Sequence, residues 1–114
     1  MIETRVYADL PYDGTNALVV KNEGAPVKAA RGGEVVYSGN GLIGYGELVI
    51  IKHDDRMLSA YAHNRRRLVG EGESVRGGQT IAEVGRNDRN EAVLHFEIRR
   101  DGKPVDPLGY LPPR

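Results

Sequence analysis

The stretch Val93-Leu94-His95-Phe96-Glu97-Ile98-Arg99 decides the fold class, because apolar and polar side chains alternate along it. A period of two is that of a β-strand, whose successive side chains point to opposite faces of a sheet. Leu94, Phe96 and Ile98 are therefore expected to face the core. The opposite face carries Val93, His95, Glu97 and Arg99.

Short apolar runs recur along the whole chain, and no stretch sustains helical periodicity. Turns rich in Gly, Asn and Asp separate the runs. Asp54-Asp55 suggests a hairpin, and Asp101-Gly102 suits a tight turn in which both central residues have positive φ. We therefore predict an all-β fold of mostly antiparallel sheets. Its other expected strands are Ala17–Lys21, Pro26–Lys28, Glu34–Tyr37, Glu47–His53, Met57–His63 and Thr80–Val84.

A second histidine lies at the end of the predicted strand Met57–His63. Alternation groups Leu58, Ala60 and Ala62 on one face and puts Ser59, Tyr61 and His63 on the other, polar face. If this strand shares a sheet with the strand of His95, the two histidines converge in one groove, as a metal or acid–base site requires. The polar segment 86–91 is expected to be an exposed loop, and the proline-rich segment 104–114 an irregular tail.

Length and composition exclude several classes of protein. The 114 residues fit one compact domain, and 16 basic residues balance 16 acidic ones, so no net charge favours nucleic acid as a partner. The absence of cysteine excludes disulfides and thiolate metal sites. We expect no membrane span, because no apolar run approaches the roughly 20 residues that a spanning helix needs.

A set of motifs occurs along the chain: Gly24-Ala25-Pro26-Val27-Lys28-Ala29-Ala30, Gly33-Glu34-Val35-Val36, Gly44-Tyr45-Gly46, Tyr61-Ala62-His63-Asn64 and Leu94-His95-Phe96-Glu97-Ile98-Arg99. Together they resemble the LytM, or lysostaphin-like, zinc peptidase family. Segments 39–46, 61–64 and 102–108 are most similar to its NlpD/EnvC branch. The resemblance implies a lysostaphin-like β-sandwich (duplicated hybrid motif) with an open groove. It also implies an N-terminal extension, partly matched, at 1–16, a degenerate LytM domain at 17–111 and a C-terminal tail at 112–114.

Active members of this family are similar in their zinc site, which uses a His-x-x-x-Asp pair and the second histidine of a His-x-His pair. The first pair falls near Gly14 and Leu18, neither of which coordinates zinc. The His-x-His pair aligns with Val93-Leu94-His95, so His95 is the only matched ligand and Val93 replaces a catalytic histidine. His63 matches the other catalytic histidine. Because catalytic zinc needs about three protein ligands, the resemblance implies a pseudo-enzyme without metal or other cofactor, in which His63 and His95 are relics.

The function implied by the resemblance is that of a non-catalytic LytM domain. Such a domain binds and activates a peptidoglycan N-acetylmuramoyl-L-alanine amidase in cell-wall remodelling and daughter-cell separation. The expected location is the periplasm or cell envelope, with any signal or lipid anchor upstream of this chain. The expected partner-binding residues combine apolar anchors with a polar and cationic rim; they are Tyr37, Tyr61, Asn64, Arg65, Arg89 and Val93.

Other interpretations stay open: a zinc-dependent peptidoglycan endopeptidase with unaligned ligands, and a passive peptidoglycan-binding domain. A lipoyl- or biotinyl-type carrier is disfavoured, because the turns Gly32-Gly33 and Gly77-Gly78 lack the lysine that such domains carry at a hairpin tip. His53 is interpreted as a histidine at a hairpin end rather than a further zinc ligand. The run Arg65-Arg66-Arg67 is either solvated surface or a contact for an acidic partner or anionic glycan.

Overall fold

The computed structural model describes residues 17–18 and 23–105 of the chain, and these residues form β-strands without any helix. The described part therefore contains no helix that could cross a membrane. The predicted all-β fold is confirmed. The strands are β1 (Ala17–Leu18), β2 (Pro26–Lys28), β3 (Gly33–Gly39), β4 (Glu47–Lys52), β5 (Met57–Arg67), β6 (Ser74–Val75), β7 (Thr80–Val84), β8 (Leu94–Arg100) and β9 (Lys103–Val105).

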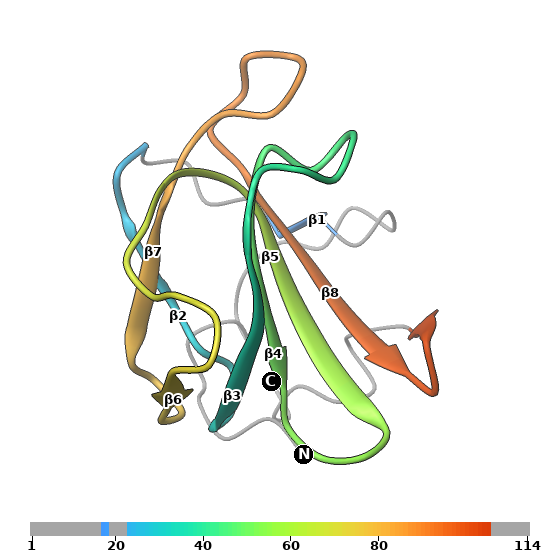
Figure 1. Ribbon diagram of the computed structural model, residues 1–114. Coiled ribbons are helices and arrows are strands. Elements are labelled where there is room, and N and C mark those ends of the chain that lie inside the picture. Colours follow the sequence, from blue (N-terminus) through green and yellow to red (C-terminus); the bar gives the residue numbers. More distant parts are fainter. Residues whose placement is uncertain (1–16, 19–22, 106–114) are drawn as a thin grey trace, which may run out of the picture.

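All strand pairs are antiparallel and belong to one sheet, whose main order is β1-β8-β5-β4-β3-β6. Strand β7 pairs with both β5 and β2, so the sheet curls back over one of its own faces. Figure 1 shows β5 between β4 and β8, with β7 and β2 on the other side of β3. The expected sandwich is thus a single curled sheet with β5 as its shared central strand.

The main core lies on the concave face of this sheet. Val49, Tyr61 and Phe96 stand opposite one another on β4, β5 and β8, and all three are fully buried. Val75 from β6 and Ile81 from β7 belong to the same cluster. Burial of this apolar surface is the main stabilising contribution to the fold.

The alternation predicted for the last long strand is confirmed, because Leu94, Phe96 and Ile98 are buried. The faces predicted for β5 were wrong in part. Ser59 and Tyr61 are fully buried in the structure, and the Tyr61 ring packs against Phe96 with a centroid distance of 5.4 Å. The physical reason is that their hydroxyls are hydrogen-bonded inside the core, which removes the cost of burying them.

A chain of hydrogen bonds satisfies these buried hydroxyls. The Ala30 backbone N–H donates to Tyr61 Oη (2.8 Å), and Tyr61 Oη lies 2.7 Å from Ser59 Oγ. His53 Nδ1 lies 2.9 Å from the Gly32 carbonyl and His53 Nε2 lies 2.7 Å from Ser59 Oγ, so His53 belongs to this internal network at the hairpin end. Burial raises the pKa of Tyr61 to about 12, which keeps the phenol neutral.

Both predicted turns are confirmed. Asp54 Oδ1 accepts hydrogen bonds from the backbone of Arg56 (2.8 Å) and Met57 (2.9 Å) and so closes the β4–β5 hairpin. Asp101 and Gly102 have φ of 52° and 80°, as the tight turn requires.

Two very short strands, β6 and β9, were not predicted. The irregular tail predicted from Pro104 was wrong at its start, because β9 pairs with β8 up to Val105. Strands of two or three residues are too short to show an alternation in sequence. The rest of the predicted tail lies outside the described residues.

We expect Tyr61→Phe to lower the free energy of unfolding by about 1–3 kcal/mol, because it leaves the buried Ala30 N–H without its acceptor. Urea denaturation at neutral pH measures the change. Tyr37→Phe is the matched control, since Tyr37 Oη accepts one bond, from the exposed Gly41 N–H. Equal stability of the two variants would show that the buried hydroxyl network contributes little.

Candidate functional site

The site forms where β5 changes its neighbour. Residues 57–62 of β5 pair with β8, ending at Ala62 opposite His95, whereas β5 from Asn64 onward pairs with β7. His63 lies between the two ladders and has a left-handed φ of 64°. Its N–H donates to the Tyr45 carbonyl (2.9 Å) and its carbonyl accepts from Gly85 N–H (3.0 Å). The strands β7 and β8 therefore diverge from β5 at His63.

This backbone conformation explains why His63 faces the same space as His95. Regular alternation along β5 would put residue 63 on the face of the buried Tyr61. The left-handed residue interrupts that alternation, and the rings of His63 and His95 lie 6.0 Å apart in a T-shaped arrangement. The predicted convergence of the two histidines is confirmed, although it depends on a turn in the backbone and not on the period of the strand.

Two adjoining hollows beside the histidines form what we call the groove. They measure about 330 Å³ and about 160 Å³ and share Tyr45 and Glu97 in their walls. The larger one is lined by Ile43, Gly44, Tyr45, His63, His95 and Glu97. The smaller one is mostly apolar and is lined by Leu42, Tyr45, Leu48, Ile50, Leu58, Ala60, Glu97 and Arg99.

A row of ionisable side chains from β8 crosses the groove. His95 Nε2 donates to Glu97 Oε1 (2.7 Å), and Arg99 Nε donates to Glu97 Oε2 (3.0 Å). The hydrogen bond from His95 and the contact with Arg99 lower the pKa of Glu97, although burial acts in the opposite direction. Arg99 Nη2 also donates to Tyr45 Oη (3.3 Å). Glu97 is thus an ionised carboxylate whose two oxygens both accept hydrogen bonds within the groove.

The environment of His63 favours its neutral form. Partial burial lowers the pKa of His63, the nearby His95 lowers it further, and Asp88 acts in the opposite direction. The imidazole is therefore expected to be uncharged near neutral pH.

The family resemblance implies a zinc ion at this place in active members. Strand β1, which pairs with β8 at His95, consists of Ala17 and Leu18, and neither residue carries a metal-coordinating side-chain atom. No group of three or more potential ligands gathers among the residues that the structure describes. Both carboxylate oxygens of Glu97 already accept hydrogen bonds. These donors do not fit a catalytic zinc centre, which needs about three protein ligands. Gly14 lies outside the described residues.

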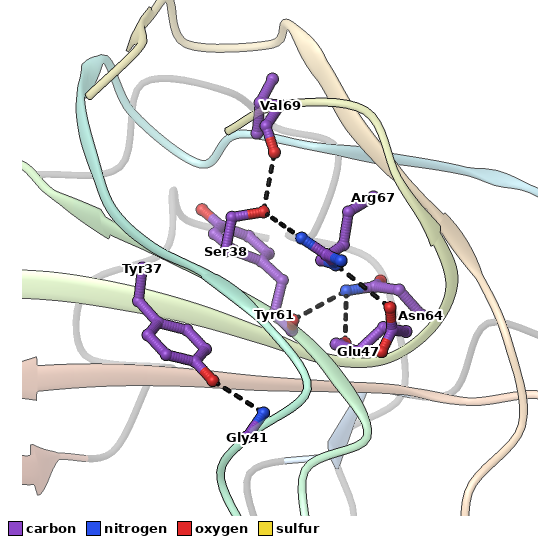
Figure 2. A network of polar contacts seen from close by, with 8 residues as sticks. All are labelled: Tyr37, Ser38, Gly41, Glu47, Tyr61, Asn64, Arg67 and Val69. Carbon is purple, nitrogen blue, oxygen red and sulfur yellow. Dashed lines mark hydrogen bonds and ion pairs between the residues drawn. The ribbon is translucent and has the colours of Figure 1, made fainter. Parts of the chain in front are cut away.

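Three of the expected partner contacts are exposed or half-buried, but they line neither hollow of the groove. Tyr37 is half-buried on β3, packs with Ala60 and Ala62, and its Oη accepts a hydrogen bond from Gly41 N–H (2.9 Å; Figure 2). Val93 is half-buried just before β8, and Arg89 is exposed in the β7–β8 loop.

The other three expected contacts form hydrogen bonds within the domain. Tyr61 is fully buried and Asn64 is only 6% exposed, so neither presents a surface to a partner in this structure. Arg65 is exposed, and its Nε donates to Glu83 Oε1 (3.1 Å). The run of arginines is thus partly used within the domain, since Arg67 also pairs with Glu47 at 3.1 Å.

Several residues that line the groove were not predicted from the sequence. Glu97 and Arg99 share the face of His95, so alternation alone already gave a signal for them. Tyr45, Leu42 and Ile43 come from the β3–β4 loop, where Leu42 is 45% and Ile43 is 99% exposed. No periodic pattern marks side chains in such a loop.

Proteins with similar sequences are named lipoproteins or activators. The chain is 65% identical over 91 residues to a "Lipoprotein NlpD/LppB homolog" of Pseudomonas aeruginosa. The aligned residues cover 80% of this chain and 31% of the relative. It is 51% identical over 96 residues to the "Murein hydrolase activator NlpD" of Escherichia coli, covering 84% of this chain and 25% of the relative. The chain therefore spans only about a third to a quarter of the length of these relatives.

The fold matches solved peptidase structures. The catalytic domain of lysostaphin from Staphylococcus simulans superposes with a TM-score of 0.75 at 26% sequence identity, covering 82% of this chain and 74% of that chain. The sequence model of Peptidase family M23 matches residues 14–107, which is most of the sequence. The chain belongs to Peptidase family M23, the LytM family that its motifs resemble.

Proposed function

We propose that this chain is a non-catalytic LytM domain that binds and activates a peptidoglycan N-acetylmuramoyl-L-alanine amidase. The observation that carries the proposal is the pairing of high identity to NlpD relatives with a groove whose donors do not fit zinc. The activity belongs to cell-wall remodelling and daughter-cell separation in the cell envelope. The lipoprotein and activator names of the relatives support this location and role.

The charge pattern of the groove suits a protein partner. Both carboxylate oxygens of Glu97 accept hydrogen bonds, from His95 and Arg99, so the groove does not present a free carboxylate. Next to this polar row, Leu48, Ile50 and Ala60 form an apolar floor. An apolar centre beside satisfied polar groups is typical of protein–protein interfaces.

Two loops provide the walls of the proposed docking surface. The β3–β4 loop carries the exposed Leu42 and Ile43, and the β7–β8 loop carries Arg89 and leads to Val93. Both loops project from the same end of the sheet, at the top of Figure 1. We propose Tyr37, Arg65, Arg89 and Val93 as partner contacts, while Tyr61 and Asn64 act from inside the fold.

The central test measures release of dye from labelled peptidoglycan by this domain alone, by a purified amidase of this class alone, and by the two together. We expect the domain to be inert by itself and to accelerate the amidase. The domain purified without added zinc is expected to contain far less than one equivalent of metal. Bound zinc together with cleavage by the domain alone would establish the endopeptidase alternative. Binding to sacculi without any effect on the amidase would establish the passive-binding alternative.

The docking surface is tested by Val93→Ala, which we expect to raise the concentration needed for half-maximal activation about 3- to 10-fold, because it shortens an apolar side chain in the contact. The matched control is Leu68→Ala, which shortens an exposed side chain outside the β3–β4 and β7–β8 loops. If both variants activate like the wild type, the contact lies away from Val93.

A further prediction concerns the ionised Glu97. Its lowered pKa means that the carboxylate stabilises the fold above its ordinary pKa near 4.5, and that this contribution is lost as the pH falls through the folded-state value. We expect Glu97→Gln to destabilise the domain by about 1–3 kcal/mol at pH 7, because His95 and Arg99 lose a charged acceptor. Urea denaturation across pH 7 to about 3 should show the difference shrinking at the acid end. A difference independent of pH would contradict an ionised Glu97.

A further inference from the structure

Asn64 lies at the point where β5 has its most irregular pairing. On one side it stands opposite Glu47 of β4, and the register shifts between Glu47 and Val49. On the other side it stands opposite Val84 of β7, and the register shifts again between Asn64 and Arg66. Such bulges leave backbone groups out of the ladder, and these groups need other partners.

The side-chain amide of Asn64 supplies two of these partners. Asn64 Nδ2 donates to the Glu47 carbonyl (3.0 Å) and to the Tyr61 carbonyl (2.8 Å), as Figure 2 shows. These two bonds fix the orientation of the amide, because a flipped amide would put Oδ1 against two carbonyl oxygens. Among the described residues, Oδ1 has no hydrogen-bond partner and is buried. Asn64 therefore acts as a donor that bridges β4 and β5.

The backbone around Asn64 is also closely confined by β7. A Cβ atom on Gly85 would lie 2.5 Å from the His63 carbonyl oxygen and 2.7 Å from the Asn64 carbonyl carbon. The Gly85 N–H donates to that His63 oxygen at 3.0 Å. Residues 63 and 64 are thus held between the end of β7 and the start of β4, next to both loops that flank the groove.

Further contacts extend from this point to β3. Arg67 Nε donates to Glu47 Oε1 (3.1 Å) and Arg67 Nη1 donates to Ser38 Oγ (2.9 Å). Ser38 Oγ donates in turn to the Val69 carbonyl (2.7 Å; Figure 2). Asn64 is buried within this network and directly follows the left-handed His63.

We propose that Asn64 is a positioning residue of the groove. Its amide fixes the place where β5 leaves β8 and joins β7, which we call the fork. In this way it holds His63 in the left-handed conformation that puts its imidazole beside His95. The importance of this geometry for activation rests on the proposed function. On this basis Asn64 acts through the groove and does not itself contact the amidase.

The test compares Asn64→Ala with Ser59→Ala. Both positions are buried on β5 and both side chains make two hydrogen bonds, but Ser59 lies toward the other end of the strand from the fork. The first readout is the NMR cross-peak between the His63 and His95 imidazole protons, together with hydrogen exchange of the Gly85 amide. We expect Asn64→Ala to lose the cross-peak and the protection of Gly85, and Ser59→Ala to keep both. Retention of both signals in Asn64→Ala, or their equal loss in Ser59→Ala, would overturn the proposal.

The second readout is the domain concentration that gives half-maximal activation of the amidase. We expect an increase of about tenfold or more for Asn64→Ala and little change for Ser59→Ala, at temperatures where both variants are folded. Equal activation by Asn64→Ala and the wild type would overturn the link between the fork and activation. If the wild type itself does not accelerate the amidase, the proposed function is wrong, and the NMR comparison still decides the role of Asn64 in the fold.

A measurement on the wild type keeps the proposal testable if Asn64→Ala does not fold. The Asn64 side-chain amide protons should exchange with solvent on the order of 100-fold more slowly than those of the exposed Asn40, because the Asn64 side chain is buried and donates two hydrogen bonds, one buried and one part-buried. Comparable exchange at the two asparagines would show that the amide does not hold the fork.

Discussion

The pairing of β5 is the constraint on which the rest of the structure depends. This strand pairs with β4 along one edge. Along its other edge it pairs first with β8 and then with β7. The change of neighbour lets the sheet curl over its core, because β7 can leave the plane that β8 continues. It also opens a space between β7 and β8, and that space is occupied by His63 and the loop after Gly85. Fold and groove therefore have one common origin in the backbone of residues 62–64.

The sequence predicted β8 better than β5, and the reason lies in how each strand satisfies its polar groups. On β8 the apolar Leu94, Phe96 and Ile98 face the core, while the polar side chains, including the buried Glu97, face the groove. On β5 the buried face carries Ser59 and Tyr61, whose hydroxyls form hydrogen bonds with each other and with Ala30 and His53. The groove face carries small alanines, which are apolar without being part of the main core. Alternation correctly predicts which residues of such a strand share a face, but it cannot predict which of the two faces packs into the main core.

The candidate site was predictable only as far as side chains follow strand geometry. His95 follows from alternation, and Glu97 and Arg99 follow with it. His63 reaches the groove through a left-handed residue that no periodic pattern encodes, and Asn64 is buried by the same irregularity. Tyr45 arrives from a loop whose path is set by contacts distant in sequence, such as the hydrogen bond between His63 N–H and the Tyr45 carbonyl. Local sequence contains little information about contacts of this kind.

The polar row on β8 connects the two walls of the groove. A half-buried histidine needs a hydrogen-bond partner. Glu97 meets this need for His95, and Arg99 balances the carboxylate while also reaching Tyr45 on the opposite wall. The side chains thus connect β8 to the β3–β4 loop across the groove. Under the proposed function this connection has a direct benefit, because a surface that is already ordered loses less conformational entropy when a partner binds.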